Sequence, residues 1–387
     1  MNPSIVLGFQ VHHPLRFTEE EDFKSNAKAF DHMVHRAYVP FIELLLEAIR
    51  DNPSFRAFIS LSGEHLHQIR THKKTGHELE DYWNKLLSTG KIQTITEPFV
   101  PSIGIWKSER NLFDQILKHH LYLRENFKVH NRTLRLFKHY KWEKTAHIAG
   151  LMGFQNILLE GKYTEFGRIP AAPLEPEDQL IIQEHAPMDY KHHLHINHER
   201  PKALVFNKSL SKIFWERFDA GDIGQDVAKE FMHRLTSSRF EAFMLDIEEF
   251  GTHPRAQEAL VFLYELIDTL TKEGVTFYQP EEWLAIAPEQ ELNRESLRQP
   301  ENHIHPPQPT GDHLLETAYK ELIQTLDMLD ATTPKHLAWH YLAHDTQQTN
   351  HYFNEHKDVK EETDQYPHFE DFLKNIQFIQ KALEKMS

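Results

Sequence analysis

The chain has 387 residues, of which 40% are hydrophobic and 26% are charged, an ordinary composition for a globular protein. It contains no cysteine, which excludes thiol catalysis, disulfide scaffolds and cysteine-ligated metal centres. A formal charge of −15 disfavours nucleic acid as the partner, and a neutral polymer such as a glycan suits this surface better. No apolar run reaches the ~20 residues of a membrane span, and no secretory signal pattern opens the chain. We therefore expect a cytoplasmic protein with neither nucleic acid nor membrane as partner.

Short apolar strands alternate with amphipathic helices along the first two thirds of the chain. This alternation is typical of a parallel sheet covered by helices. Pro40 lies inside the first helical stretch, where it should kink or break the helix. Strands are predicted at residues 5–11, 55–61, 92–95, 134–137, 157–159 and 242–245, and helices at 34–49, 79–87, 110–127 and 146–152.

The predicted units are numerous enough to close a barrel, whose chemistry would lie at the C-terminal ends of the strands. Residues 160–200 are interrupted by prolines and are predicted as loop. A second proline-rich stretch is followed by amphipathic helices. The predicted domains are a catalytic-type barrel at 1–287, a linker at 288–310 and a C-terminal helical bundle at 311–387.

Two strand ends carry side chains suited to chemistry. His12 and His13 follow the first strand, where a histidine binds a hydroxyl, donates a proton or ligates a metal; a histidine-rich surface turn is the alternative. Asp246 ends an apolar strand, and Glu248 follows two residues later. Paired carboxylates serve glycoside hydrolysis; alternatively, Asp246 caps the next helix and Glu248 is solvated.

Two further clusters are less informative. His192, His193, His195 and His198 could hold Zn²⁺, but they lie in a proline-rich stretch without helical spacing, which favours adventitious metal binding. Residues 134–142 form a basic and aromatic rim at another strand end. The sequence has no glycine-rich phosphate loop, no nucleophile elbow and no zinc-protease motif, so no cofactor and no metal are predicted.

Six segments match the motifs of one family in the same order. The motif pairs are F-Q-V-H-Q-P with residues 9–14, Y-L-P-x-x-E-L-L-L with 38–46, F-S-I-S-G with 58–63, G-K-V-E-L-L-G-E with 90–97, L-G-F-K-G-I-L-T-E-G with 152–161 and M-D-Y-E-T-F-G-x-H with 245–253. The C-terminal region around 339–353 and 369–383 is similar too. Over nearly its whole length, the chain thus resembles glycoside hydrolase family 57, the α-amylase and 4-α-glucanotransferase group.

The resemblance implies an incomplete (β/α)7 barrel with a helical C-terminal region, acting on α-glucans by a retaining double displacement. Asp246 matches the family's acid/base residue. The nucleophile is a Glu in an R-N-T-E-L strand end, and counting back without gaps places Lys138 there. Gln93 and Pro101 also replace a usual Glu and His. A shifted alignment would recruit Glu143 or Glu97 instead.

Three hypotheses follow. In the first, the protein binds α-glucan or maltooligosaccharide but is catalytically impaired, because a Lys ammonium cannot attack the anomeric carbon. The second is an active α-amylase or 4-α-glucanotransferase with a non-standard nucleophile. The third is a metal-dependent, polysaccharide deacetylase-like hydrolase, with His12, His253 and Asp246 as ligands. The predicted substrate-binding residues are His12, His13, Glu97, Trp142, Glu248 and His253.

Overall fold

The computed structural model describes residues 2–13, 27–99, 109–136, 142–161, 163–168 and 201–288, together with 290, 292, 377, 380 and 381. Three sequence predictions lie outside these residues: Lys138 at the nucleophile position, the histidine cluster at 192–198, and nearly all of the linker and C-terminal bundle. The domain boundaries therefore remain predictions.

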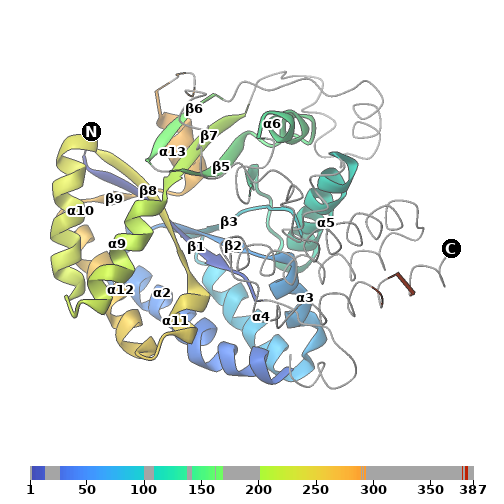
Figure 1. Ribbon diagram of the computed structural model, residues 1–387, viewed down its shortest axis with the longest axis horizontal. Coiled ribbons are helices and arrows are strands. Elements are labelled where there is room, and N and C mark those ends of the chain that lie inside the picture. The colour runs from blue at the N-terminus through green and yellow to red at the C-terminus, as the bar shows by residue number, and fades with distance from the viewer. Residues whose placement is uncertain are drawn as a thin grey trace, which may run out of the picture.

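Seven parallel strands of the described chain follow one another around an open barrel (Figure 1). In the first sheet the order is β3-β2-β1-β8, and in the second β4-β5-β7. A parallel bridge between Thr96 and Leu134 joins the two sheets. The strands are β1 Ser4–Val11, β2 Ala57–Leu61, β3 Ile92–Thr94, β4 Thr133–Arg135, β5 Asn156–Gly161, β7 Lys202–Asn207 and β8 Phe240–Asp246.

Two short strands lie beside this barrel. β9 (Thr276–Phe277) pairs with the start of β1, and β6 (Glu165–Arg168) pairs antiparallel with β7. The prediction of loop across residues 160–200 was wrong for β6. Its partner β7 comes more than thirty residues later, and pairing with a distant strand leaves no local signal in so short a segment.

Helices cover the outside of the strands (Figure 1). The first helical stretch is a π-helical turn, η1 (Val34–Tyr38), that runs into α2 (Val39–Asp51). Pro40 is the second residue of α2 and comes directly after the π-helical turn, and prolines and π-turns are both places where a helix departs from regular geometry. The other helices are α3 Gly63–Thr71, α4 Lys73–Leu87, α5 Glu109–Phe127, α6 Trp142–Leu151, α9 Lys208–Asp219, α10 Gly224–Ser238, α11 Ile247–Thr252, α12 Ala256–Lys272 and α13 Pro280–Ile286.

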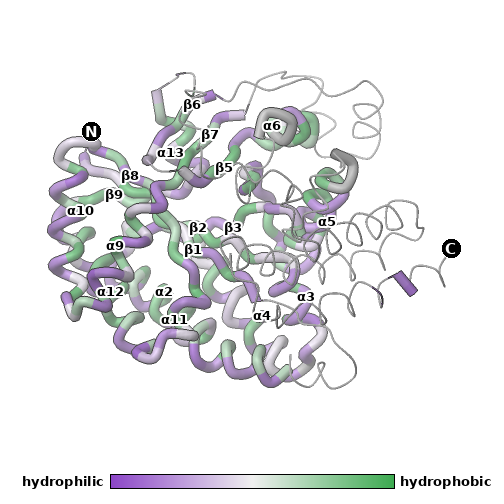
Figure 2. The backbone as a smooth tube through the Cα atoms, viewed as in Figure 1, coloured by the Kyte–Doolittle hydropathy of each residue, from purple (hydrophilic) through white to green (hydrophobic). Residues whose placement is uncertain are grey.

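The strands separate two hydrophobic layers. Along β1, Ile5, Leu7 and Phe9 pack toward the helices, whereas Val6 packs with Phe58 and residues of other strands inside the barrel. Alternate side chains of a strand point to opposite sides. Both sides of β1 are buried, because the helices cover one side and the barrel interior encloses the other. Figure 2 accordingly shows apolar strands in the centre and polar residues on the outer sides of the helices.

Gly8 marks the tightest place in the barrel interior. A Cβ atom at this position would lie 2.0 Å from the ring of Phe58. We predict that Gly8→Ala lowers the free energy of unfolding by about 1–3 kcal/mol through overpacking. Gly150→Ala is the matched control, since its Cβ would meet only Pro201 at 3.8 Å and alanine favours a helix. Urea unfolding measures both; equal stabilities would contradict the packing argument.

Candidate active site

A buried arginine organises the C-terminal ends of the strands. Arg135, the last residue of β4, is 0% exposed. Its Nη1 donates to Glu97 Oε2 at 3.2 Å and to Ser60 Oγ at 3.3 Å. Its Nη2 donates to Gln10 Oε1 at 2.7 Å and to Glu160 Oε1 at 3.0 Å. One guanidinium therefore links β1, β2, β5 and the segment that follows β3.

The two carboxylates on Arg135 have different environments. Burial raises the pKa of Glu97, although Arg135 and a hydrogen bond from Ser60 oppose the increase. Burial acts in the same direction on Glu160, but the charges of Arg135 and of Lys208, whose Nζ lies 2.7 Å from Glu160 Oε2, bring its pKa below the usual value. The second cation makes Glu160 the more firmly ionised of the two.

Asp246 lies at the C-terminal end of β8, where it caps the next helix and also faces a cavity. Its Oδ1 accepts the backbone N–H of Glu248 at 2.9 Å, so that it caps α11, and its side chain also lines a cavity. Burial raises its pKa from 3.8 to about 6, against the effects of the cap and of Arg135. A carboxyl group with this pKa still carries a proton in part of the molecules near pH 6, where an ordinary Asp is ionised, and this suits a general acid.

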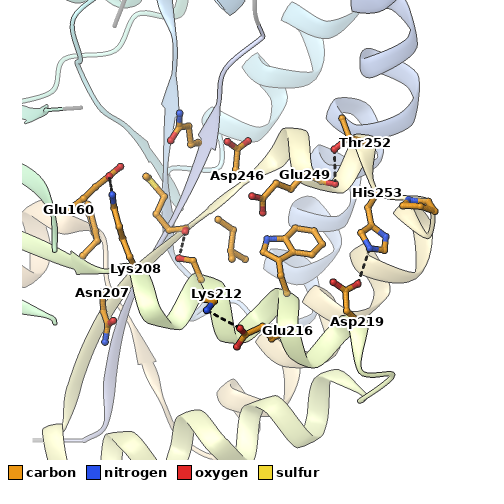
Figure 3. A pocket seen from close by; sticks show the side chains of 17 residues that line it. Glu160, Asn207, Lys208, Lys212, Glu216, Asp219, Asp246, Glu249, Thr252 and His253 are labelled. Carbon is orange, nitrogen blue, oxygen red and sulfur yellow. Dashed lines mark hydrogen bonds and ion pairs between the residues drawn. The ribbon is translucent and has the colours of Figure 1, made fainter. Parts of the chain in front are cut away.

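The cavity beside Asp246 has a volume of about 870 Å³, within the ~300–1,000 Å³ of small-molecule sites. Glu160 and Lys208 lie at one end, His253 and Asp219 at the other, and Asp246 and Glu249 between them (Figure 3). The walls come from the strand ends of β1, β5, β7 and β8 and from helix α9. The predicted binding residue His253 thus shares this cavity with Asp246.

His12 and His13 belong to a buried network behind the cavity. His13 Nδ1 lies 3.0 Å from the hydroxyl of Tyr38, which donates to Glu248 Oε1 at 3.1 Å. His12 Nε2 lies 3.4 Å from Glu64 Oε2. Burial, with help from Arg135, lowers the pKa of His12 to about 4, so this ring is neutral at physiological pH. The structure therefore brings His13 and Glu248 together through Tyr38.

The other predicted site residues are spread more widely. Glu97 is fully buried on Arg135 and is not part of the cavity lining. Trp142 begins α6, and Lys138 lies outside the described residues. For these three residues, the role in catalysis or binding stays a prediction.

The ligand set of the metal hypothesis is not assembled in the described part of the chain. His12 contacts Glu64, and His253 Nε2 lies 3.0 Å from Asp219 Oδ1. Among the described residues, no group of three or more His, Asp or Glu side chains is arranged to hold a metal ion. In the same residues, no helix has the length and apolarity to cross a membrane.

Sequence reasoning missed four residues of the site. Glu160 stands at the end of an apolar run, the same signal that identified Asp246, whereas Arg135 belongs to the cluster at 134–142 that was interpreted only as a basic and aromatic rim. Tyr38 ends the π-helical turn, and such turns are frequent at functional sites. Trp215 lines the cavity from α9, a helix for which no prediction was made.

A parallel barrel with a carboxyl group of raised pKa at a strand end is suited to general acid–base chemistry. Residues 6–297 match the model of Glycosyl hydrolase family 57, and the chain belongs to this family. The membership predicted from the sequence motifs is confirmed.

Similar proteins agree with this membership. A Methanocaldococcus jannaschii protein provisionally named an alpha-amylase is 25% identical over 270 residues, which cover 64% of this chain and 52% of the relative. The 4-alpha-glucanotransferase of Thermococcus litoralis superposes with a TM-score of 0.59 at 14% identity, over 89% of this chain and 55% of the other. This chain thus spans about half the length of both relatives.

A second similar structure matches over nearly its full length. The alpha-amylase AmyC of Thermotoga maritima has a TM-score of 0.57 at 11% identity, and the match covers 100% of this chain and 93% of the other. These similarities establish the fold, and the predicted incomplete (β/α)7 barrel is confirmed.

We predict that Arg135→Met lowers the free energy of unfolding by about 3–5 kcal/mol, because it leaves Glu97 and Glu160 without their shared cation. Arg50→Met is the matched control, since Arg50 is exposed and its ion pairs with Glu47 and Asp51 are screened by solvent. Chemical denaturation compares the two variants. A similar small effect for both would show that the buried network contributes little.

The raised pKa of Asp246 gives a pH-dependent prediction. Between pH ~4 and ~6 the folded state keeps a proton that the unfolded chain releases, so this residue lowers stability as pH rises through that window. Asp246→Asn retains a good helix cap and removes the titration. We expect the variant to gain of the order of 2 kcal/mol over the wild type at pH 7.5 but not at pH 4.

Thermal unfolding at the two pH values measures the gain. Asp226→Asn is the control for the substitution itself, because Asp226 is an exposed residue of α10. A gain in the Asp246 variant that is the same at both pH values would contradict the raised pKa.

Proposed function

We propose that this protein binds α-glucans in the cavity beside Asp246 and is impaired in the retaining hydrolysis of its family, because Lys138 occupies the nucleophile position. The observation that carries the proposal is the place of Arg135. In the family motif R-N-T-E-L the arginine stands three residues before the nucleophile. Here Arg135 is the last residue of β4, at the mouth of the barrel, which supports the register that aligns Lys138 with the missing Glu.

In the described site, the two carboxylates that contact Arg135 are poorly placed to replace the nucleophile. A retaining enzyme needs a second carboxylate ~5–5.5 Å from the acid, in contact with the anomeric carbon. Glu97 is enclosed by Ser60 and Arg135. Both oxygens of Glu160 are bound to cations, Oε1 to Arg135 and Oε2 to Lys208. Neither carboxylate is presented to substrate as a nucleophile.

The choice of an α-glucan rests on the relatives. Two similar structures are an alpha-amylase and a 4-alpha-glucanotransferase, and the curated relative carries an alpha-amylase name. The cavity fits this class of ligand, because carboxylate, amide and hydroxyl groups along its walls can bond to sugar hydroxyls.

An active enzyme with a non-standard nucleophile is the second candidate. Glu160 and Asp246 share one cavity, and their environments move their pKa values in opposite directions. Such a split is the usual sign of an acid and an ionised partner in one active site. This candidate requires Glu160 to be freed from Lys208 during turnover.

Product analysis with maltoheptaose tests the two candidates. We expect no change of chain length after long incubation with the wild type, while the sugar still raises the melting temperature. Lys138→Glu should then gain hydrolysis, since it supplies the missing carboxylate, and the double variant with Asp246→Asn should lose that gain. Lys138→Gln, which removes the charge without adding a nucleophile, is the matched control and should stay inactive.

The opposite outcome has an equally clear form. Robust turnover by the wild type that disappears in both Asp246→Asn and Glu160→Gln would overturn the impairment and favour the second candidate. Absence of any effect of maltoheptaose on the melting temperature would contradict glucan binding itself.

A further inference from the structure

Helix α9 presents one face to the cavity. Lys208, Ser211, Lys212, Trp215, Glu216 and Asp219 all line it. They recur at spacings of three and four residues, which places them on one side of a helix. This face extends the cavity from the strand ends, where Asp246 lies, to the far end at His253 and Asp219 (Figure 3).

Trp215 is the aromatic residue of this face, and its ring is held in place from several sides. The ring of Phe250 meets it edge to face, with centroids 4.7 Å apart, and that of Phe214 does so at 5.2 Å. The imidazole of His253 lies nearly parallel to the indole, at 5.8 Å and 23°. Trp215 is only partly buried, so it combines a fixed orientation with a surface open to the cavity.

His253 is fixed in turn by two hydrogen bonds. Its Nδ1 accepts the backbone N–H of Arg255 at 3.1 Å, which assigns the ring proton to Nε2. Nε2 then donates to Asp219 Oδ1 at 3.0 Å. The pair Trp215 and His253 is therefore a pre-organised aromatic wall, and little side-chain entropy is lost when a ligand packs on it.

The indole N–H of Trp215 is buried, and no acceptor among the described residues bonds to it. A buried donor without a partner costs free energy, and a sugar hydroxyl would supply the missing acceptor if the side chains that cover the N–H move apart. Carboxylates of Glu216, Asp219 and Glu249 line the same part of the cavity and can accept from further hydroxyls. An apolar face combined with a donor and several acceptors matches a sugar ring, which has apolar C–H faces and a polar edge.

We propose that Trp215 and His253 form a binding subsite for a glucosyl residue of the α-glucan chain, adjoining the glucosyl residue that meets Asp246. The inference rests on the proposed function and deepens it by assigning the α9 face to the same ligand. At about 870 Å³ the cavity exceeds the needs of a single sugar ring, and it runs past Asp246 to His253. The subsite is built by a helix and an aromatic pair, separately from the strand ends that carry the acid.

The test compares matched tryptophan variants in the full chain. Trp215→Phe keeps the ring packing and removes the N–H, whereas Trp215→Ala removes both. Trp283→Phe is the matched control. Trp283 also has a buried indole N–H without a partner in the described residues, but it stacks on Phe240 with centroids 3.7 Å apart and is not part of the cavity lining.

Calorimetric titration with maltoheptaose gives the affinities, and melting temperatures show whether each variant is folded. We expect the Kd to weaken about tenfold in Trp215→Ala and by a smaller factor in Trp215→Phe. Trp283→Phe should bind as the wild type does. In ¹⁵N-labelled wild type, the indole N–H resonance that is lost in Trp215→Phe should shift when maltoheptaose is added, and the one lost in Trp283→Phe should not.

The two levels of the proposal fail differently. Equal affinity of all variants, with no shift of the Trp215 resonance, would overturn the subsite and leave glucan binding intact. Should the wild type fail to bind maltoheptaose at all, the proposed function fails and the subsite fails with it. If Trp215→Ala is unfolded, the resonance shift in the wild type and the Trp215→Phe titration still decide the question.

Discussion

The guanidinium of Arg135 is the constraint on which the mouth of the barrel depends. A fully buried cation is tolerated only where its charge and its donors are satisfied. Glu97, Glu160, Ser60 and Gln10 do this from four separate segments. Because each partner follows or ends a strand, the hydrogen bonds fix the strand ends relative to one another, and with them the place of every side chain at this end of the barrel.

The burial that makes the charge of Arg135 costly in free energy also raises the pKa of Asp246. Removal from water favours the neutral carboxyl, and burial is the largest contribution to its raised pKa. Glu160, bound by two cations, shifts in the opposite direction. Low dielectric alone would raise both pKa values, so the placement of Arg135 and Lys208 around Glu160 is what separates the pKa values of the two carboxyl groups.

The sequence predicted what local patterns determine and missed what distant contacts determine. Apolar runs located β1 and β8, and the motif around Asp246 located a carboxyl group that lines the cavity, since these signals lie within a few residues. β6 depends on a partner more than thirty residues away. The role of Trp215 depends on which side of α9 packs against the barrel, and Arg135 became informative only when its four partners came together in three dimensions.

In the proposed site, binding and chemistry use different parts of this molecule. Asp246 lies at a strand end, whereas Trp215 and the aromatic wall belong to α9 and to the segment after α11. Position 138 comes after the last residue of β4 and lies outside the described residues, whereas the Arg135 network and the α9 face are built from other residues. Only interactions that strengthen in the transition state accelerate a reaction. A chain with a lysine at the nucleophile position would lose the stronger binding of the transition state and keep the contacts to the bound substrate. This is the physical basis for the proposed glucan binding without hydrolysis.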